Sequence, residues 1–137
     1  MRPLLTWPCL ALSALALSAC GATSTTSTSG FSGVKEEVAR RIADFQSDAN
    51  GAEQKKVCGD DLSARLVARL GGRGRCEAAI KKQLQQIDNP ELTIESVRIG
   101  AGERTATASV KSIHEGKSRA SSLSLVKEGG GWRIAGS

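Results

Sequence analysis

The spacing of the apolar residues changes at Asn89-Pro90, and this change limits the folds that the chain can adopt. Before that point, apolar residues recur every three or four positions, which is typical of amphipathic helices. After it they recur every second position, as in strands with one buried face. A chain that places its helices before its strands forms an α+β domain, in which the helices cover one face of an antiparallel sheet.

Three helices are predicted before Pro90. The first ends at a break over residues 48–51, and its apolar stripe consists of Phe31, Val34, Val38, Ile42 and Phe45. The second is expected to begin at an Asp60 or Asp61 N-cap, because a short acidic side chain can accept the free N–H groups of a first turn. Its apolar positions are Leu62, Leu66 and Leu70. The third follows the glycine-rich residues 71–74, and its stripe consists of Cys76, Ala79, Ile80, Gln83, Leu84 and Ile87.

Four strands are predicted after Pro90. Turn signals at residues 100–102, 115–116 and 129–131 separate them, which predicts an antiparallel meander. In the first strand, two apolar pairs share a face only if one extra residue is accommodated at Glu95-Ser96, which predicts a β-bulge. These pairs are Leu92 with Ile94, and Val97 with Ile99. The inward positions of the later strands are Ala106, Ala108, Val110, Leu123, Leu125, Trp132 and Ile134.

The first 19 residues have the layout of an export signal. Arg2 supplies a positive start, and residues 4–17 form an apolar run that contains Cys9. The run is shorter than the roughly 20 apolar residues that a membrane-spanning helix needs. Leu17-Ser18-Ala19-Cys20 resembles the lipobox of bacterial lipoproteins. The resemblance implies cleavage before Cys20, a thioether-linked diacylglyceryl group on Cys20 and an acylated amine, with palmitate as the expected acyl chain. The alternative is an ordinary secretory signal with Cys20 there by chance.

These features divide the chain into three parts. Residues 1–19 are the predicted signal peptide, residues 20–33 the lipidated cysteine with a flexible Ser/Thr/Gly tether, and residues 34–137 the folded domain. The tether has too little apolar content to offset the entropy of ordering. We expect the protein to be anchored in the cell membrane through Cys20, facing the extracytoplasmic side of the envelope.

The charge of the predicted mature chain is moderate and evenly spread. Without residues 1–19 it has 18 Lys and Arg and 14 Asp and Glu, which gives a net charge of +4. This pattern is typical of a solvated surface, and it is compatible with anionic lipid headgroups. The same part of the chain has three aromatic residues and no Tyr. Nucleic acid is therefore disfavoured as a partner, because single strands stack on aromatic side chains.

Cys58 and Cys76 are the two cysteines left in the folded domain. An exported protein lies in an oxidising compartment, where an even pair is usually bridged, so we predict a structural disulfide. A redox-active pair is the alternative, but such pairs usually read Cys-x-x-Cys. A zinc site would need four ligands, and His114 is the only histidine. The sequence indicates no metal and no cofactor.

The order of the elements resembles the NTF2-like (SnoaL-like) superfamily, and in particular small bacterial lipoproteins of that kind. The resemblance is carried by TATASV at residues 105–110 and by SLSLVKEGGGWRIAG at residues 122–136. It implies a cone in which three N-terminal helices pack on a curved four-stranded antiparallel meander, with a pocket at the wide end. The side chains expected to line that pocket are Phe45, Leu84, Val110, Leu125 and Trp132.

No catalytic constellation is visible in the sequence. Enzymes of the resembled superfamily use a carboxylate base or a His–Asp pair, and isomerase-like members also use a Tyr, which this chain lacks. Asp44 and Asp48 lie on the first helix and are candidates to face a pocket, whereas Asp60 and Asp61 are interpreted as caps. His114 falls at a hairpin tip, where a histidine is usually solvated.

The sequence therefore predicts a non-enzymatic lipoprotein. It is expected to bind a small apolar molecule, a lipid or an envelope protein partner, or to form a homodimer, through its pocket or its sheet. The alternative is an isomerase- or dehydratase-type enzyme of the same fold, acting on a small hydrophobic substrate. A third reading is a folded spacer whose core side chains fill the cone.

Overall fold

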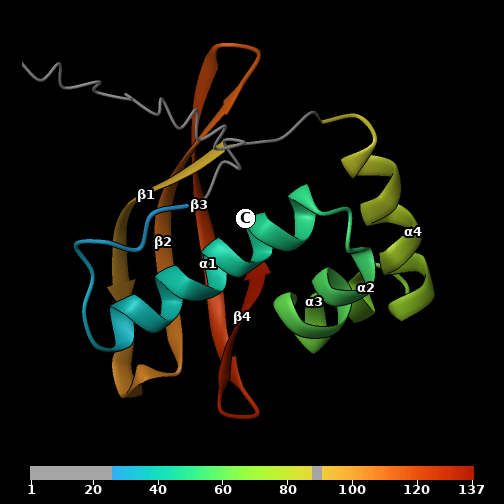
Figure 1. Ribbon diagram of the computed structural model, residues 1–137. Helices are drawn as coiled ribbons and strands as arrows, with labels where there is room; N and C mark the ends of the chain where they lie inside the picture. The colour runs from blue at the N-terminus through green and yellow to red at the C-terminus, as the bar shows by residue number, and fades with distance from the viewer. Residues whose placement is uncertain (1–25, 88–90) are drawn as a thin grey trace, which may run out of the picture.

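The computed structural model of this protein describes residues 26–87 and 91–137 (Figure 1). The predicted signal peptide, the Cys20 lipidation site and the helix stop at Asn89-Pro90 lie outside the described residues. Within the described ranges, no helix has both the length and the apolar character needed to cross a bilayer.

The helices come first along the chain and the strands follow. The helical part consists of α1 (Val34–Asn50), α2 (Gln54–Lys56), the π-helical turn η1 (Val57–Asp61), α3 (Ala64–Arg69) and α4 (Arg73–Leu84). The strands are β1 (Glu91–Ile99), β2 (Thr105–His114), β3 (Lys117–Glu128) and β4 (Gly131–Gly136), with a short 3₁₀ turn, η2 (Ala101–Glu103), between β1 and β2. All neighbouring strands pair antiparallel in the order β1-β2-β3-β4. The predicted α+β meander is confirmed.

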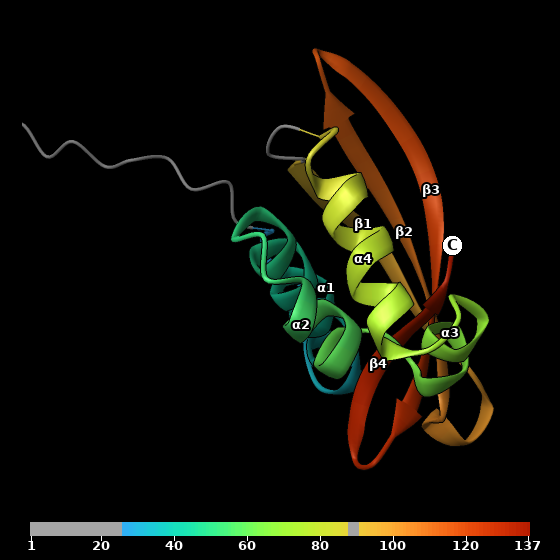
Figure 2. The ribbon, with the colours of Figure 1, turned by 90° about the vertical axis from the view of Figure 1, so that its right-hand side faces the viewer.

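The predicted bulge in β1 is also confirmed. Ile94 pairs with Val110 and Ser96 pairs with Ser109, which leaves Glu95 between two consecutive pairs. The extra residue brings Ile94 and Val97 to the same buried face. Bulges of this kind bend a strand and increase its twist, and the sheet of this domain is curved (Figure 2).

Two of the predicted turns are two-residue hairpin loops. Glu115 and Gly116 join β2 to β3 with φ angles of 50° and 73°, and Gly129 and Gly130 join β3 to β4 with φ angles of 56° and 81°. Positive φ at both central residues matches the right-handed twist of the flanking strands. The β2–β3 hairpin projects beyond the rest of the domain (Figure 1).

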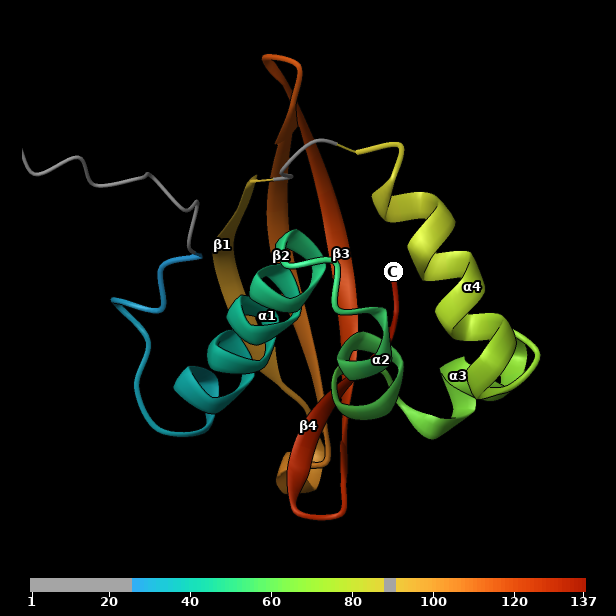
Figure 3. The same ribbon diagram turned by 45° about the vertical axis from the view of Figure 1, so that its right-hand side comes forward.

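Helix α1 lies across one face of the sheet and contacts β1 and β4 (Figure 3). The interior between them is filled by apolar side chains of both layers. From the helical part these are Val38, Ala39, Ile42, Val57 and Leu62, and from the sheet Ile94, Val97, Ala106, Ala108, Val110, Leu125, Trp132 and Ile134. The inward faces predicted for the strands are therefore confirmed, with Leu123 half-buried.

The second predicted helix begins later than expected, and the Asp60 or Asp61 cap is wrong. Ser63 is the N-cap of α3, and its Oγ accepts the Leu66 N–H at 3.2 Å. The cause is a tertiary contact: Leu62 bridges Ile134 of β4, and the Ser63 N–H donates to the Ile134 carbonyl at 2.8 Å. This pairing keeps the chain extended before α3. The helix then ends at Arg69, which leaves Leu70 37% exposed rather than in a buried stripe.

The sequence also missed the short α2 and η1, so the helical part has more than the three predicted elements. The stripe of α4 is only partly buried: Cys76 is enclosed, Ile80, Leu84 and Ile87 are half-buried, and Ala79 and Gln83 are exposed. Helix α4 lies on the same side of the sheet as α1 (Figure 2) and contacts η1, α2 and α3.

The segment before α1 contacts the domain. Residues 26–33 are the described part of the predicted tether. Within this segment, Thr26 is buried and Phe31 packs against the core.

The predicted Cys58–Cys76 disulfide is present, and it joins η1 to the first turn of α4 across 18 residues of chain. We expect Cys58→Ala combined with Cys76→Ala to lower the free energy of unfolding by about 3 kcal/mol, because the open chain gains entropy when unfolded. Urea denaturation measures this change, and reduced wild-type protein should match the double variant. An unchanged denaturation midpoint would contradict a stabilising role for the bridge.

Candidate functional site

Two hollows flank Arg133 of β4, and this residue lines both of them. Arg133 is half-buried between Trp132 and Ile134, which both point into the core. Its Nη1 donates to the Gly59 carbonyl in η1 at 2.6 Å. Arg133 therefore joins the edge of the sheet to the π-helical turn, and its guanidinium separates the two hollows.

The first, the apolar hollow, has a volume of about 470 Å³ and lies among η1, α3 and the turn between β3 and β4. Its apolar lining consists of Cys58, Leu62, Ala64, Val67 and Ala68. Three charged side chains, Arg73, Glu128 and Arg133, border it. Small-molecule sites commonly have volumes of roughly 300–1,000 Å³ and combine an apolar lining with a few polar groups. The apolar hollow matches these sites in volume and lining, and it is open to solvent, with Ala64 and Ala68 exposed.

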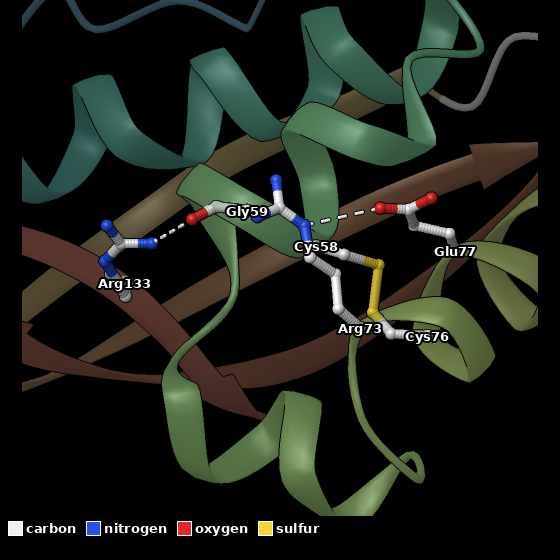
Figure 4. The surroundings of a disulfide bond; sticks show 6 residues. All are labelled: Cys58, Gly59, Arg73, Cys76, Glu77 and Arg133. Atoms are coloured by element: carbon white, nitrogen blue, oxygen red, sulfur yellow. Dashed lines mark hydrogen bonds and ion pairs between the residues drawn. A yellow bond between two sulfur atoms is a disulfide. The ribbon is translucent and has the colours of Figure 1, made fainter.

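Two guanidinium groups flank Gly59 at the border of the apolar hollow (Figure 4). Arg133 donates to the Gly59 carbonyl, and the Arg73 Nη2 lies 2.7 Å from where a Cβ on Gly59 would be. The missing side chain at Gly59 therefore lets Arg73 approach the backbone. Arg73 also pairs with Glu77, its Nε 3.4 Å from the Glu77 Oε1. Glu128 accepts the Ala64 N–H at 3.1 Å.

The second, the polar hollow, has a volume of about 430 Å³ and lies on the other side of Arg133. Its other lining residues come from α1, α2 and η1: Arg41, Asp44, Ser47, Asp48, Lys56 and Asp60. The candidates Asp44 and Asp48 thus border the same hollow. The side chain of Asp44 is 54% exposed, whereas that of Asp48 is 19% exposed.

A buried carboxyl pair lies behind the polar hollow. The side chain of Asp61 is fully buried, and its Oδ1 accepts the Arg41 Nη1–H at 2.8 Å. Its Oδ2 is buried without a hydrogen-bond partner in the described part of the chain, and the charge of Asp48 acts on the same carboxyl. Asp61 is therefore the buried partner of Arg41 with a second carboxyl acting on it, and it caps no helix.

The pKa values of both carboxyls are raised. Burial raises the pKa of Asp61 to about 7, against the opposing effect of the Arg41 hydrogen bond. Burial also raises the pKa of Asp48, against the opposing effects of Asp61 and of the charge of Lys56, whose Nζ is 3.9 Å from the Asp48 Oδ1. Desolvation disfavours the charged form of a carboxyl, so this pair holds a proton at pH values where an exposed Asp has lost it.

The residues predicted to line a pocket do not come together around either hollow. Trp132 is buried in the core and borders a third hollow of about 330 Å³ beside Arg40 and Arg41. Val110 and Leu125 are buried in the core, and Phe45 packs against it. Leu84 is half-buried in the last turn of α4. Their role as ligand contacts stays a prediction.

His114 ends β2 at the hairpin tip, as predicted, and its side chain is 46% exposed. Its Nε2 lies 3.9 Å from the neighbouring Glu115 carboxylate. Within the described ranges, no group of three His, Cys, Asp or Glu side chains is arranged to hold a metal ion.

The charged residues that border the hollows were largely missed from the sequence. Arg41, Arg73 and Arg133 lie far apart in the chain and match no motif. Arg133 also gives no signal, because a polar residue between the inward Trp132 and Ile134 is the ordinary alternation of a strand with one buried face. Asp61 was misread because an Asp before an apolar stripe is the usual sign of a helix start.

The architecture corresponds to the NTF2-like α+β cone fold, with helices packed on a curved four-stranded antiparallel sheet. No known family model matches the chain, and no curated protein matches it. The solved structure of Rd1NTF2_05, an NTF2-like design with five substitutions, is similar with a TM-score of 0.51 and 17% identity. The match covers 73% of this chain and 94% of that chain.

Two further solved structures show weaker likeness. A de novo designed protein with a curved β-sheet has a TM-score of 0.37 and 17% identity, over 46% of this chain. This chain spans 58% of the length of that design. The intermembrane space region of the chloroplast protein ARC6 has a TM-score of 0.42 and 11% identity, over 72% of this chain and 89% of that chain. The likeness to the NTF2-like design alone supports the fold, and it says nothing of function.

The carboxyl pair predicts a pH-dependent stability. The folded protein keeps a proton that the unfolded chain releases near pH 3.8, so the resulting stabilisation is complete below that pH and lost by about pH 7. We expect the free energy of unfolding to fall by up to about 4 kcal/mol across this window. Asp61→Asn cannot titrate but still accepts a hydrogen bond from Arg41. Its free energy of unfolding should therefore decrease less across this pH window than that of the wild type.

Chemical denaturation between pH 4 and pH 8 measures this effect. Asp44→Asn is the matched control, because Asp44 borders the same hollow but its side chain is 54% exposed. This control should show the same decrease in the free energy of unfolding with rising pH as the wild type. An equal decrease in wild type and Asp61→Asn would show that the carboxyl pair does not hold the proton.

Proposed function

We propose that this protein is an exported, membrane-anchored lipoprotein that performs no catalysis and binds a small apolar molecule or lipid. The observation that carries the binding role is the apolar hollow, whose volume of about 470 Å³ and apolar lining suit a small ligand. It lies on the helical side of an NTF2-like domain, a fold compatible with ligand binding.

The proposed compartment and anchor rest on different observations. Leu17-Ser18-Ala19-Cys20 resembles a lipobox, and the Cys58–Cys76 bridge is typical of oxidising compartments. Two or three acyl chains on Cys20 would hold the protein at the membrane far more firmly than one, since each buried CH₂ contributes about 0.8 kcal/mol. The ligand site would then lie close to a supply of lipid.

We expect Cys20→Ser to release the protein from the membrane fraction and to remove the mass of the acyl groups, because serine provides no thiol for the thioether. Fractionation followed by intact-mass measurement tests this. Cys9→Ser is the matched control, since Cys9 lies in the predicted signal and should leave the mature mass and location unchanged. A membrane-bound Cys20→Ser protein of unchanged mass would contradict the lipid anchor.

The ligand role is tested by native mass spectrometry of the protein purified gently from its own envelope. We expect an additional mass of a few hundred daltons that is lost in Ala68→Trp, because Ala68 lines the apolar hollow and the indole would fill it. Ala79→Trp, on the exposed face of α4, should keep the ligand. A wild-type protein without added mass, or equal retention in both variants, would contradict this role for the hollow.

An enzyme of the same fold is the second candidate, and the buried carboxyl pair favours it. A carboxyl with a raised pKa beside an arginine is an arrangement often found at catalytic sites. Asp61 is fully buried, so Asp48 at the polar hollow would be the group that meets a substrate. Turnover of a small hydrophobic substrate that is lost in Asp48→Asn and kept in Asp44→Asn would establish this alternative.

The exposed sheet face offers a different mode of binding, to a protein partner or a second copy. The face opposite the core carries small hydroxyl side chains along β2 and β3, including Thr107, Ser122 and Ser124, which are exposed. It has little apolar area on which a stable interface could be built. We therefore rank it behind the apolar hollow.

A further inference from the structure

We propose that the ligand of the apolar hollow is a single-chain amphiphile with one carboxylate head, which is held by Arg133 together with Arg73. This inference rests on the proposed function, since it names the chemistry of a ligand at the same hollow. It starts from the two guanidinium groups that flank Gly59 (Figure 4).

Arg133 provides the first argument. One of its N–H groups donates to the Gly59 carbonyl, and no carboxylate of the described residues lies within 4 Å of its guanidinium. The group is half-buried at the border of the apolar hollow. A guanidinium has five N–H donors in a planar fork that suits a carboxylate, so Arg133 has donors left for a ligand.

The charges around the hollow limit the number of charges that the head can carry. Arg73 pairs with Glu77, and Glu128 borders the same hollow. These two carboxylates balance the formal charges of the two arginines, and of the two guanidinium groups only that of Arg133 has no carboxylate partner among the described residues. A single unpaired guanidinium, with Glu128 at the same border, suits a monoanion better than a dianion.

The apolar lining indicates what the rest of the ligand is. Beyond Gly59, the lining consists of Leu62, Val67, Ala68 and the Cys58 half of the disulfide, which present no charge. An alkyl chain is the group that such a lining favours, because burial of each CH₂ contributes about 0.8 kcal/mol. A chain in the hollow with its carboxylate at Gly59 satisfies both parts of the site at once.

The test compares three ligands with the same alkyl chain below their aggregation limit: dodecanoate, dodecanol and dodecyl phosphate. Calorimetric titration uses the full chain carrying Cys20→Ser, which removes the acylation site only. We expect dodecanoate to bind at least tenfold more tightly than dodecanol, since a charge-assisted hydrogen bond contributes about 1.5 kcal/mol or more. Dodecyl phosphate, a dianion near neutral pH, should bind less tightly than dodecanoate.

Substitutions of the two arginines test whether these residues cause the preference for dodecanoate over dodecanol. Arg133→Gln and Arg73→Gln should each reduce the preference for carboxylate over alcohol, and Arg133→Lys should keep most of it because the charge remains. Arg119→Gln is the control, since Arg119 is exposed on the β2–β3 hairpin far from the hollow. Because Arg133 also contacts Gly59, the denaturation midpoints of its variants are measured to check that they fold. Arg73→Gln tests the same ligand preference without removing this contact.

The outcomes separate this inference from the proposed function. Equal binding of dodecanoate and dodecanol would overturn the carboxylate head and leave an apolar ligand in place. Tighter binding of the phosphate would overturn the monoanion. Binding of none of the three chains would overturn both the inference and the apolar-ligand role of the hollow.

Discussion

The backbone hydrogen bond from the Ser63 N–H to the Ile134 carbonyl fixes where the helical layer meets the edge of the sheet. It pairs the chain after η1 with β4, so Leu62 is extended and α3 cannot begin before Ala64. The π-helical turn just before this pairing is then held from three sides. Arg41 of α1 binds Asp61, Arg133 of β4 binds Gly59, and Cys76 of α4 bridges Cys58.

The position of this turn explains why a charged hollow and an apolar hollow lie so close together. Asp61 points into the domain, where burial raises the pKa of its carboxyl and Arg41 is its ion-pair partner. A buried carboxylate without such partners would be strongly destabilising. Gly59 and Cys58 in the same turn border the apolar hollow, and Arg133 separates it from the polar one. The two surfaces therefore depend on the same short segment, although their chemistry differs.

The sheet could be predicted in detail because its signal is local. Alternation placed Ala106, Val110 and Leu125 on the buried face, and the parity change at Glu95-Ser96 identified the bulge. Glycines at residues 116, 129 and 130 marked the hairpin loops, where the backbone needs positive φ. The disulfide could be predicted from the count of cysteines in the folded part and from their expected compartment. The helix bounds were predicted less well than the strands. Pairing of Leu62 and Ser63 with β4 moves the start of the second predicted helix to Ala64.

The candidate site could not be predicted, for a physical reason that its residues illustrate. Arg41, Arg73 and Arg133 read as ordinary solvated charges in the sequence, because nothing nearby in the chain marks them as partners of one another. In the sequence, Asp61 has the pattern of a helix N-cap. Only its burial in η1 raises the pKa of its carboxyl.

The sequence by itself determined the order of helices and strands, the inward face of each strand and the bulge, since these follow from spacing along the chain, and it determined the bridged cysteines because only two remain in the folded part. Only the tertiary structure decided the start of α3, the pairing of Asp61 with Arg41 and Asp48, and the convergence of two arginines on Gly59. Those features depend on contacts between segments that are distant in sequence, and their energies exceed the local preferences that a pattern records.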